Sequence, residues 1–268
     1  MSQHPTAKQA PKGQLRYLTG SPVDGTTGKS VLMFFGSLVI MALLYLVAGG
    51  MGAAMANLLG TFLCGGMLLL TAMIFFFTGQ SGGTQAVNQG EIMQRRLDTG
   101  GTVTPEEQAR CFHPLKGFII ALLGILPFLV VTVVFALITR RQMPTPGALP
   151  TWVSGLTSRP DLLAPLSIYT QPPALGAEDI LRIFVRILLL PWSGLLGIRE
   201  ADGFLLMERL SPLLVLLPAV SYGVGYLTGV QTRARVHADI AEGKKKQQKK
   251  ARREHRRKMA GRGPEQLN

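Results

Sequence analysis

Four long apolar runs without a charged residue constrain this chain more than any other feature. They cover residues 31–47, 51–77, 117–138 and 210–227. At 1.5 Å per residue, a helix of about 17 residues or more is long enough to cross a hydrocarbon core of ~30 Å. Only 16% of the residues are charged, whereas soluble domains average about 25%. The pattern excludes a chain disordered throughout and predicts an all-α integral membrane protein with four transmembrane helices.

Short features inside these runs refine the expected helices. Only residues 48–50 separate the first two runs, which predicts a tight helical hairpin. Pro127 lies within the third run, where neighbouring helices can satisfy the carbonyl group that a proline frees, so we expect a kink rather than an end. Pro212 falls in the first turn of the last run, a position where proline is tolerated.

A shorter segment, residues 179–198, has a different pattern. Asp179, Arg182, Arg186 and Ser193 fall on one narrow helical stripe at 100° per residue, with apolar residues elsewhere. This spacing predicts an amphipathic helix that lies along the interface, or a re-entrant helix whose stripe faces protein or water. The alternative is that the segment crosses the membrane, which would give five transmembrane helices.

The distribution of Lys and Arg sets the expected orientation. With four spans and a cytoplasmic N-terminus, 21 basic residues lie inside and 7 outside; with five spans, 17 lie inside, 10 outside, and Arg186 within the bilayer. We therefore expect a multi-pass cell-membrane protein whose N- and C-termini are both cytoplasmic. The weak point is the pair Arg140 and Arg141, which would face outward.

The segments between and beside the spans form four further regions. Residues 1–30 read as a flexible leader, and residues 142–178 as a proline-rich outer loop with Trp152 and Tyr169 as interfacial anchors. In the cytoplasmic loop, residues 79–116, we expect a flexible stretch that begins with Gly-Gln-Ser-Gly-Gly, then short helices over 91–98 and 105–112. Thr104 and Glu107 have the spacing of a capping box at the start of the second of these helices.

Residues 231–268 form a polybasic cytoplasmic tail with 13 Lys and Arg against 4 Asp and Glu. Its helix propensity is good over 241–258, which predicts an exposed helix continuing from the last span at low salt or on an anionic partner. Such a tail binds anionic lipid head groups, binds RNA or the ribosome through phosphates, or only sets topology. The basic block comprises Lys244, Lys245, Lys246, Lys249, Lys250, Arg252, Arg253, Arg256, Arg257 and Lys258.

Two intramembrane features are candidates for specific contacts. Arg182 and Arg186 could hold a lipid phosphate or another anion, or they could be paired with Asp179, Asp202 or Glu208. Small residues recur every four positions along the second span, which favours close helix packing, either within the chain or in a homo- or hetero-oligomer. This ridge comprises Ala48, Gly52, Ala56, Gly60 and Cys64. Ser221, Gly225 and Gly229 form a shorter ridge of the same kind.

No catalytic motif is visible in the sequence. It holds no phosphate-binding loop, zinc-protease motif or nucleophile elbow, and Cys111 with His113 supplies only two of four structural zinc ligands. We therefore expect no enzyme activity, no cofactor and no metal. The leading hypothesis is a non-enzymatic membrane scaffold or accessory subunit. The alternative is a small transporter or channel component, and a weaker one is a ribosome-associated membrane-insertion factor.

Overall fold

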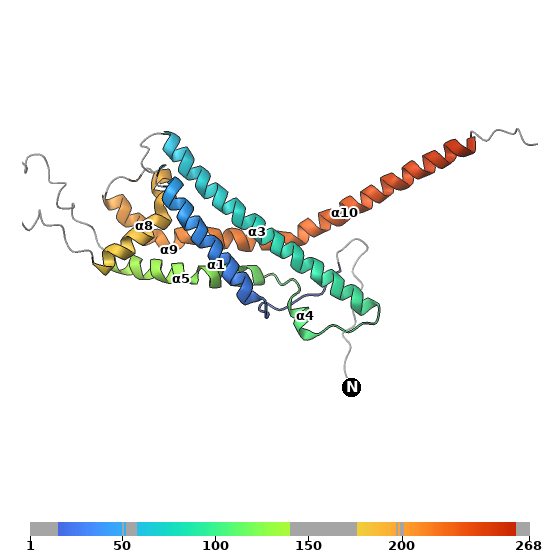
Figure 1. Ribbon diagram of the computed structural model, residues 1–268, viewed down its shortest axis with the longest axis horizontal. Coiled ribbons are helices and arrows are strands. Elements are labelled where there is room, and N and C mark those ends of the chain that lie inside the picture. Colours follow the sequence, from blue (N-terminus) through green and yellow to red (C-terminus); the bar gives the residue numbers. More distant parts are fainter. Residues whose placement is uncertain are drawn as a thin grey trace, which may run out of the picture. The chain divides into compact units, whose positions relative to one another are not determined.

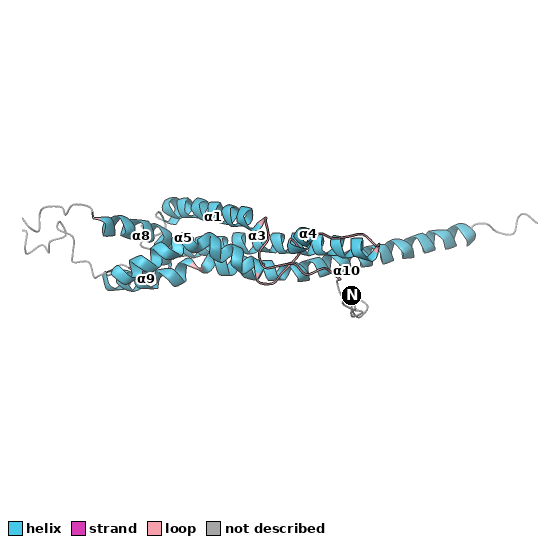
Figure 2. Cartoon of the chain, turned by 90° about the horizontal axis from the view of Figure 1, so that it is seen from below, coloured by secondary structure: helices cyan, strands magenta, loops and turns pink. Residues whose placement is uncertain are grey.

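The computed structural model describes residues 16–49, 51, 58–139, 176–196, 198 and 201–260. Figure 1 shows its helices, and Figure 2 shows that helices joined by loops make up the part drawn in colour. The described helices are α1 (Thr27–Leu44), η1 (Tyr45–Gly49), α3 (Leu58–Asp98), α4 (Pro105–Ala109), α5 (Lys116–Ile138), α8 (Ala177–Leu196), α9 (Ala201–Val215) and α10 (Leu217–Ala260). Extended pairing within these residues is limited to an isolated bridge between Thr19 and Phe112.

Within the described residues, which are helical apart from loops, four segments are long and apolar enough to cross a membrane, as expected for an all-α membrane protein. They are Thr27–Val47, Leu58–Asp98, Lys116–Ile138 and Asp202–His255. The large apolar side chains on their outer faces are exposed, among them Leu32, Phe62 and Leu137. Such a surface is unfavourable in water and natural in lipid, because lipid tails are as apolar as these side chains.

The chain divides into two compact units. The tail unit contains Met1–Thr27, Phe76–Ile119 and Tyr222–Asn268, and the bundle unit contains Gly28–Phe75 and Ile120–Ser221. The tail unit holds 20 of the 28 basic residues and 9 of the 15 acidic residues. Most of the positive charge therefore belongs to one unit, as the sequence pattern indicates.

In the bundle unit, α1 packs against α3 and α5 through aromatic side chains. The rings of Phe34 and Phe75 meet edge to face at 5.1 Å, and Phe35 lies 5.5 Å from Phe128. A Cβ at Gly124 would approach the Phe34 ring to 2.5 Å, so glycine permits this contact between α1 and α5. The Tyr45 hydroxyl donates a hydrogen bond of 2.8 Å to Thr71 Oγ1, which ties η1 to α3.

At one end of the bundle unit α8 lies across the other helices. We call this the distal end: it is where α1 and α5 finish and α3 begins. Helix α8 contacts both α9 and η1, and Figure 1 shows it in yellow running across that end rather than along the bundle. A Cβ on Gly65 of α3 would come 3.3 Å from Leu195, near the end of α8.

In the tail unit, α3 and α10 cross at a seam of glycines. A Cβ at Gly79 or Gly83 would overlap the carbonyl oxygen of Tyr222 or Tyr226, and one at Gly225 would overlap the carbonyl oxygen of Phe76. The prediction of a flexible stretch at residues 79–83 is therefore wrong, and so is the separate helix over 91–98. Close backbone packing compensates the low helix propensity of glycine, so α3 continues without interruption to Asp98.

Of the leader, the structure describes residues 16–30; the part before α1, residues 16–26, is packed rather than flexible. The Leu18 amide donates to Gly90 O at 3.1 Å, and the Gly20 amide donates to Phe112 O at 2.9 Å. The Tyr17 ring meets Phe112 edge to face at 6.0 Å. These contacts between distant segments fix the leader against the end of α3, which no local pattern in residues 1–30 indicates.

Two boundaries near the last span also differ from prediction. Helix α9 already begins at Ala201, nine residues before the last apolar run, so Pro212 lies inside α9 rather than in a first turn. The helix is interrupted at Leu216, two residues before Pro218, whose missing N–H is tolerated in the first turn of α10.

Other predictions on local structure have clear outcomes. The capping box is confirmed: the Glu107 amide donates to Thr104 Oγ1 and the Glu107 carboxylate accepts from the Thr104 amide, although α4 ends at Ala109 rather than near 112. Helix α5 continues through Pro127 as expected. Residues 142–175 of the expected proline-rich loop, which include Trp152 and Tyr169, lie outside the described residues.

Candidate functional site

The most buried ionic cluster of the bundle unit is centred on Glu208 of α9. One carboxylate oxygen is 2.8 Å from Arg186, while the other accepts a 2.8 Å hydrogen bond from Thr139 and lies 3.6 Å from Arg182. The side chain of Glu208 is only 2% exposed. A carboxylate taken out of water is stabilised only when it is paired and hydrogen-bonded, and these three partners do both.

The two arginines also contact groups other than Glu208. Arg182 forms an ion pair of 2.7 Å with Glu178 and lies 3.7 Å from Asp179. Its guanidinium stands over the Phe135 ring at 5.7 Å, and that of Arg186 stands over Phe204 at 5.2 Å. Of the three possible partners inferred from sequence, Glu208 and Asp179 both contact the arginines. These contacts join the two arginines to three carboxylates.

Helix α8 presents its polar stripe inward and its apolar face outward. Arg182, Val185, Leu189 and Ser193 are buried, whereas Ile180, Ile183 and Leu196 are exposed. This is the reverse of a helix at the surface of a soluble protein, whose apolar stripe faces the core. The amphipathic pattern predicted for residues 179–198 is therefore present, with the stripe directed at α9 and α5.

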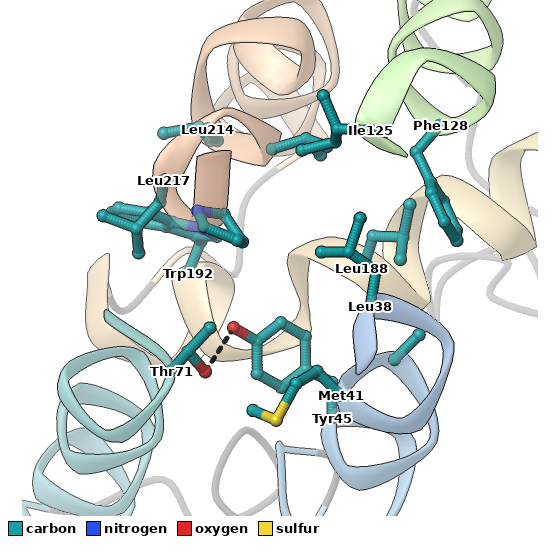
Figure 3. Close-up of a pocket in the computed structure, with 13 residues that line it drawn as sticks. Leu38, Met41, Tyr45, Thr71, Ile125, Phe128, Leu188, Trp192, Leu214 and Leu217 are labelled. Carbon is teal, nitrogen blue, oxygen red and sulfur yellow. Dashed lines mark hydrogen bonds between the residues drawn. The ribbon is translucent and has the colours of Figure 1, made fainter. Parts of the chain in front are cut away.

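Two cavities in the described part of the bundle unit have mainly apolar linings. A small cavity of about 40 Å³ lies beneath α8 and is lined by side chains that include Trp192, Leu214 and Ile125. Figure 3 shows the Tyr45 to Thr71 hydrogen bond at its edge. It holds a few waters at most, too little for a solute of metabolite size. A wider groove of α1, α5 and α8 has a wholly apolar lining, with Phe35, Pro127 and Phe184 among its residues.

The ionic cluster of the tail unit is centred on Glu91 of α3. Arg233 lies 3.1 Å from its carboxylate and His237 lies 3.0 Å from it, both from α10, and Arg233 also donates to Asn88 Oδ1 at 2.8 Å. Burial raises the pKa of Glu91, but the hydrogen bonds and charges of Arg233 and His237 outweigh it, so that the pKa is lowered. This cluster fixes α10 to α3 beyond the apolar runs.

A second ion pair in the tail unit joins the leader to the start of α5. Lys116 Nζ is 2.8 Å from Asp24 Oδ2, and both side chains are buried. Burial raises the pKa of Asp24, but hydrogen bonds from Lys116, Thr27 and Thr26 lower it to about 2. Lys116 also donates to the carbonyl oxygen of Ala109 at 3.1 Å. No signal in the sequence linked Asp24, in a segment expected to be flexible, with Lys116.

The polybasic block lies on one continuous, exposed helix. Helix α10 extends to Ala260, and every residue from Ala241 to His255 is exposed. One ion pair within this stretch joins Lys246 to Glu242 at 2.8 Å, and both of its side chains are mostly exposed. The helix expected from propensity is therefore observed. Its charge stays at the surface, available to a partner.

The members of the small-residue ridge are only partly described. Gly60 and Cys64 are buried on the face of α3 that also carries Leu68, Thr71 and Phe75, so they pack within the bundle unit. Gly52 and Ala56 fall outside the described residues, and Ala48 is described only as part of η1. Gly225 and Gly229 of the shorter ridge pack directly on α3. An oligomeric role for the longer ridge stays a prediction.

The described residues contain no cluster of three or more potential metal ligands. Cys64 and Cys111 are both free and buried, and burial raises the pKa of the Cys111 thiol. A buried thiol that is protonated is a poor nucleophile and a poor metal ligand.

In comparisons with known proteins, no family model, no curated protein and no solved structure matches this chain.

Proposed function

We propose that the protein is a non-enzymatic membrane scaffold with four spans, and that it holds a rigid basic helix at the cytoplasmic face. The observation that carries the proposal is the contact of Glu91 with Arg233 and His237. It joins the end of α3 to the beginning of the basic tail. A scaffold of this kind acts by position and charge rather than by chemistry.

The same contact supports the four-span topology over the five-span alternative. In the five-span arrangement the loop over 79–116 lies outside and the tail inside, so a bilayer would separate Glu91 from Arg233. An ion pair of 3.1 Å requires both residues on one side. The leader belongs on this side too, because Leu18 and Gly20 bond to Gly90 and Phe112.

The position of α8 supports the same count. One part of α8 reaches the end of α5 through Arg186, Glu208 and Thr139, while other contacts join it to η1 at the end of α1. Both neighbours lie at the distal end, so α8 enters and leaves the membrane at the same face. With its apolar side outward and its arginines paired inward, α8 is a re-entrant helix embedded in the distal leaflet.

The positive-inside rule then gives the orientation. The leader, the loop over 79–116 and the tail together carry 21 of the 28 basic residues, so their common side is cytoplasmic and the distal end faces outward. Arg140 and Arg141 remain the exception on the outer side.

A scaffold is favoured over a transporter or channel component by the character of the bundle unit. A solute route needs a polar cavity at mid-membrane depth with an unneutralised charge. The arginines are instead paired with Glu178, Asp179 and Glu208 at the distal end, and the cavity beside Tyr45 is small and mainly apolar.

Cysteine accessibility in intact cells tests the proposed topology. Single cysteines replace Gln94, Asp202 and Gln247 in a background that carries Cys64→Ala and Cys111→Ala. With a membrane-impermeant maleimide we expect only Asp202→Cys to react from outside, while Gln94→Cys and Gln247→Cys react after permeabilisation. Reaction of Gln94→Cys from outside would reject the four-span scaffold and restore the five-span alternative.

A further inference from the structure

The basic helix points to a specific class of partner. Helix α10 is one continuous element from Leu217 to Ala260. From Tyr222 to His237, α10 is held in the tail unit by the glycine seam and by the Glu91 cluster. Gln80 adds a 2.9 Å hydrogen bond to Thr232. Figure 1 shows the orange-to-red part of α10 leaving the other helices beyond this region. The polybasic block is therefore carried on a helix with a fixed point of attachment.

The length of this helix keeps the basic block away from the bilayer. The last apolar run ends at Leu227, and at 1.5 Å per residue Lys244 follows after about 26 Å and Arg253 after about 39 Å of helix. Even at a tilt of about 40°, the upper end of the range for membrane helices, most of the block stands beyond the polar head groups. The potential of an anionic membrane falls off within a Debye length of about 8–10 Å, so the surface attracts these cations weakly.

The arrangement of the charges argues against a flat surface as well. At 100° per residue, the seven basic residues between Lys244 and Arg253 cover an arc of about 240° around the helix. All seven are exposed. A planar bilayer can contact only one side of a helix, and this segment has no apolar stripe to insert into lipid. A partner that engages most of the cations must surround the helix.

Folded RNA satisfies these requirements. Its phosphates come from several strands and line concave grooves and junctions, whereas a DNA duplex is a convex rod that meets another rod along a single line. The block has no Phe, Tyr or Trp on which bases could stack, so recognition would rest on phosphate contacts and would be sensitive to salt. We propose that the exposed helix from Lys244 to Arg253 binds the phosphate backbone of folded RNA at the cytoplasmic face, which rests on the topology proposed above.

Binding is measured with the full-length protein in nanodiscs of zwitterionic lipid. Fluorescence anisotropy reports binding of a labelled three-way-junction RNA. A DNA duplex and a single-stranded RNA of equal length are the comparison ligands. At 0.1 M salt we expect the junction RNA to bind at least roughly fivefold more tightly than the DNA duplex or the single-stranded RNA. If the DNA duplex binds as tightly as the junction RNA, the assignment to RNA is wrong. This assay does not depend on orientation in a cell, so its failure is separate from a failure of the topology.

Matched variants test the role of the block. The triple variant Lys244→Gln, Lys245→Gln, Lys246→Gln should weaken binding of the junction RNA roughly tenfold and reduce the slope of log K against log salt by about 2 to 3. The charge-preserving variant Lys244→Arg, Lys245→Arg, Lys246→Arg should retain it. Unchanged binding of the Gln variant would overturn the proposal.

Anionic lipid is the alternative partner of the basic block, and a change of lipid composition tests it. Replacing 30% of the zwitterionic lipid by phosphatidylglycerol should change the affinity for the junction RNA by less than about threefold, because the block stands away from the surface. A loss of tenfold or more would show that the tail lies on anionic lipid and would overturn binding to RNA as its role.

Discussion

Each of the two units is organised around one buried glutamate, and the two glutamates differ in their surroundings. Glu208 has two arginines and a threonine around it in the apolar bundle unit, and an aromatic ring lies against each arginine. Glu91 has Arg233 and His237, which are 24% and 36% exposed, in the charged tail unit. A charge left without its partner costs more where the dielectric constant is lower. The first cluster therefore stabilises the bundle unit, while the second determines where the basic helix begins.

The largest effect should follow from Glu208→Gln. This change removes one carboxylate partner from Arg186 and one from Arg182, and breaking a buried pair costs about 3–5 kcal/mol. We expect about 3 kcal/mol, because Arg186 is 37% exposed. The free energy of unfolding is measured by titration with dodecyl sulfate in mixed micelles. Glu178→Gln, whose side chain is 45% exposed, is the control. A loss of equal size in both variants would contradict a special role for the Glu208 cluster.

The next largest effect concerns the glycine seam. In Gly83→Ala the new methyl group overlaps the carbonyl oxygen of Tyr226, and overpacking of this kind costs about 1–3 kcal/mol. Gly243→Ala is the matched control on an exposed part of α10, where nothing lies within 4 Å; there alanine should stabilise the helix by about 0.5–1 kcal/mol. Dodecyl sulfate titration compares the two variants. The same sign of change in both would mean that α3 and α10 do not approach closely at Gly83.

The Asp24 to Lys116 pair predicts a pH dependence confined to the tail unit. The pKa of Asp24 is lowered from 3.8 to about 2, so its ionised form stabilises the folded state above pH ~4 and this contribution is lost as pH falls from ~4 to ~2. A shift of this size corresponds to roughly 2 kcal/mol.

The thermal midpoint of the wild-type protein and of Asp24→Asn, recorded from pH 6 to pH 2, measures that contribution. The difference between the two proteins should be constant above pH ~4 and vanish near pH 2. A difference that is independent of pH would show that the carboxylate charge of Asp24 contributes nothing.

A smaller effect is expected for Glu91→Gln. The cluster is partly exposed to water, so we expect a loss of about 1 kcal/mol, as for hydrogen bonds with charged groups near a surface. The sharper readout is local: limited trypsin digestion should cut faster after Arg233 and Arg235 once α10 is less firmly held. Glu106→Gln, on the exposed helix α4, is the control. Equal digestion rates in wild type and Glu91→Gln would contradict the role of Glu91 in holding the basic helix.

The sequence predicted the membrane helices well because their signal is local and large. The apolar runs, the capping box at Thr104 and the amphipathic stripe of α8 each depend on residue types at fixed spacing within one element. The stripe also indicated that Arg182 and Arg186 point the same way. The sequence did not show that the stripe faces Glu208, because Asp179 and Asp202 carry the same charge and were equally possible partners.

The features that the sequence did not predict depend on contacts between distant segments. Gly79 and Gly83 resemble a flexible linker until Tyr222 and Tyr226 lie against them. Glu91 and Arg233 are 142 positions apart, and neither belongs to a motif. Asp24 lies in a segment without periodicity. In each case tertiary packing overrides a weak local preference, and a single sequence contains no record of it.

A double-mutant cycle across Glu91 and Arg233 tests the central claim, that the end of α3 and the start of the basic helix lie together on one side of the membrane. Glu91→Arg and Arg233→Glu are made singly and together, and the free energy of unfolding is measured for all four proteins. We predict that each single reversal destabilises the protein and that the double reversal recovers at least about 1 kcal/mol relative to the sum of the two. Strict additivity would contradict the claim, because residues on opposite faces of a bilayer have no direct interaction to restore.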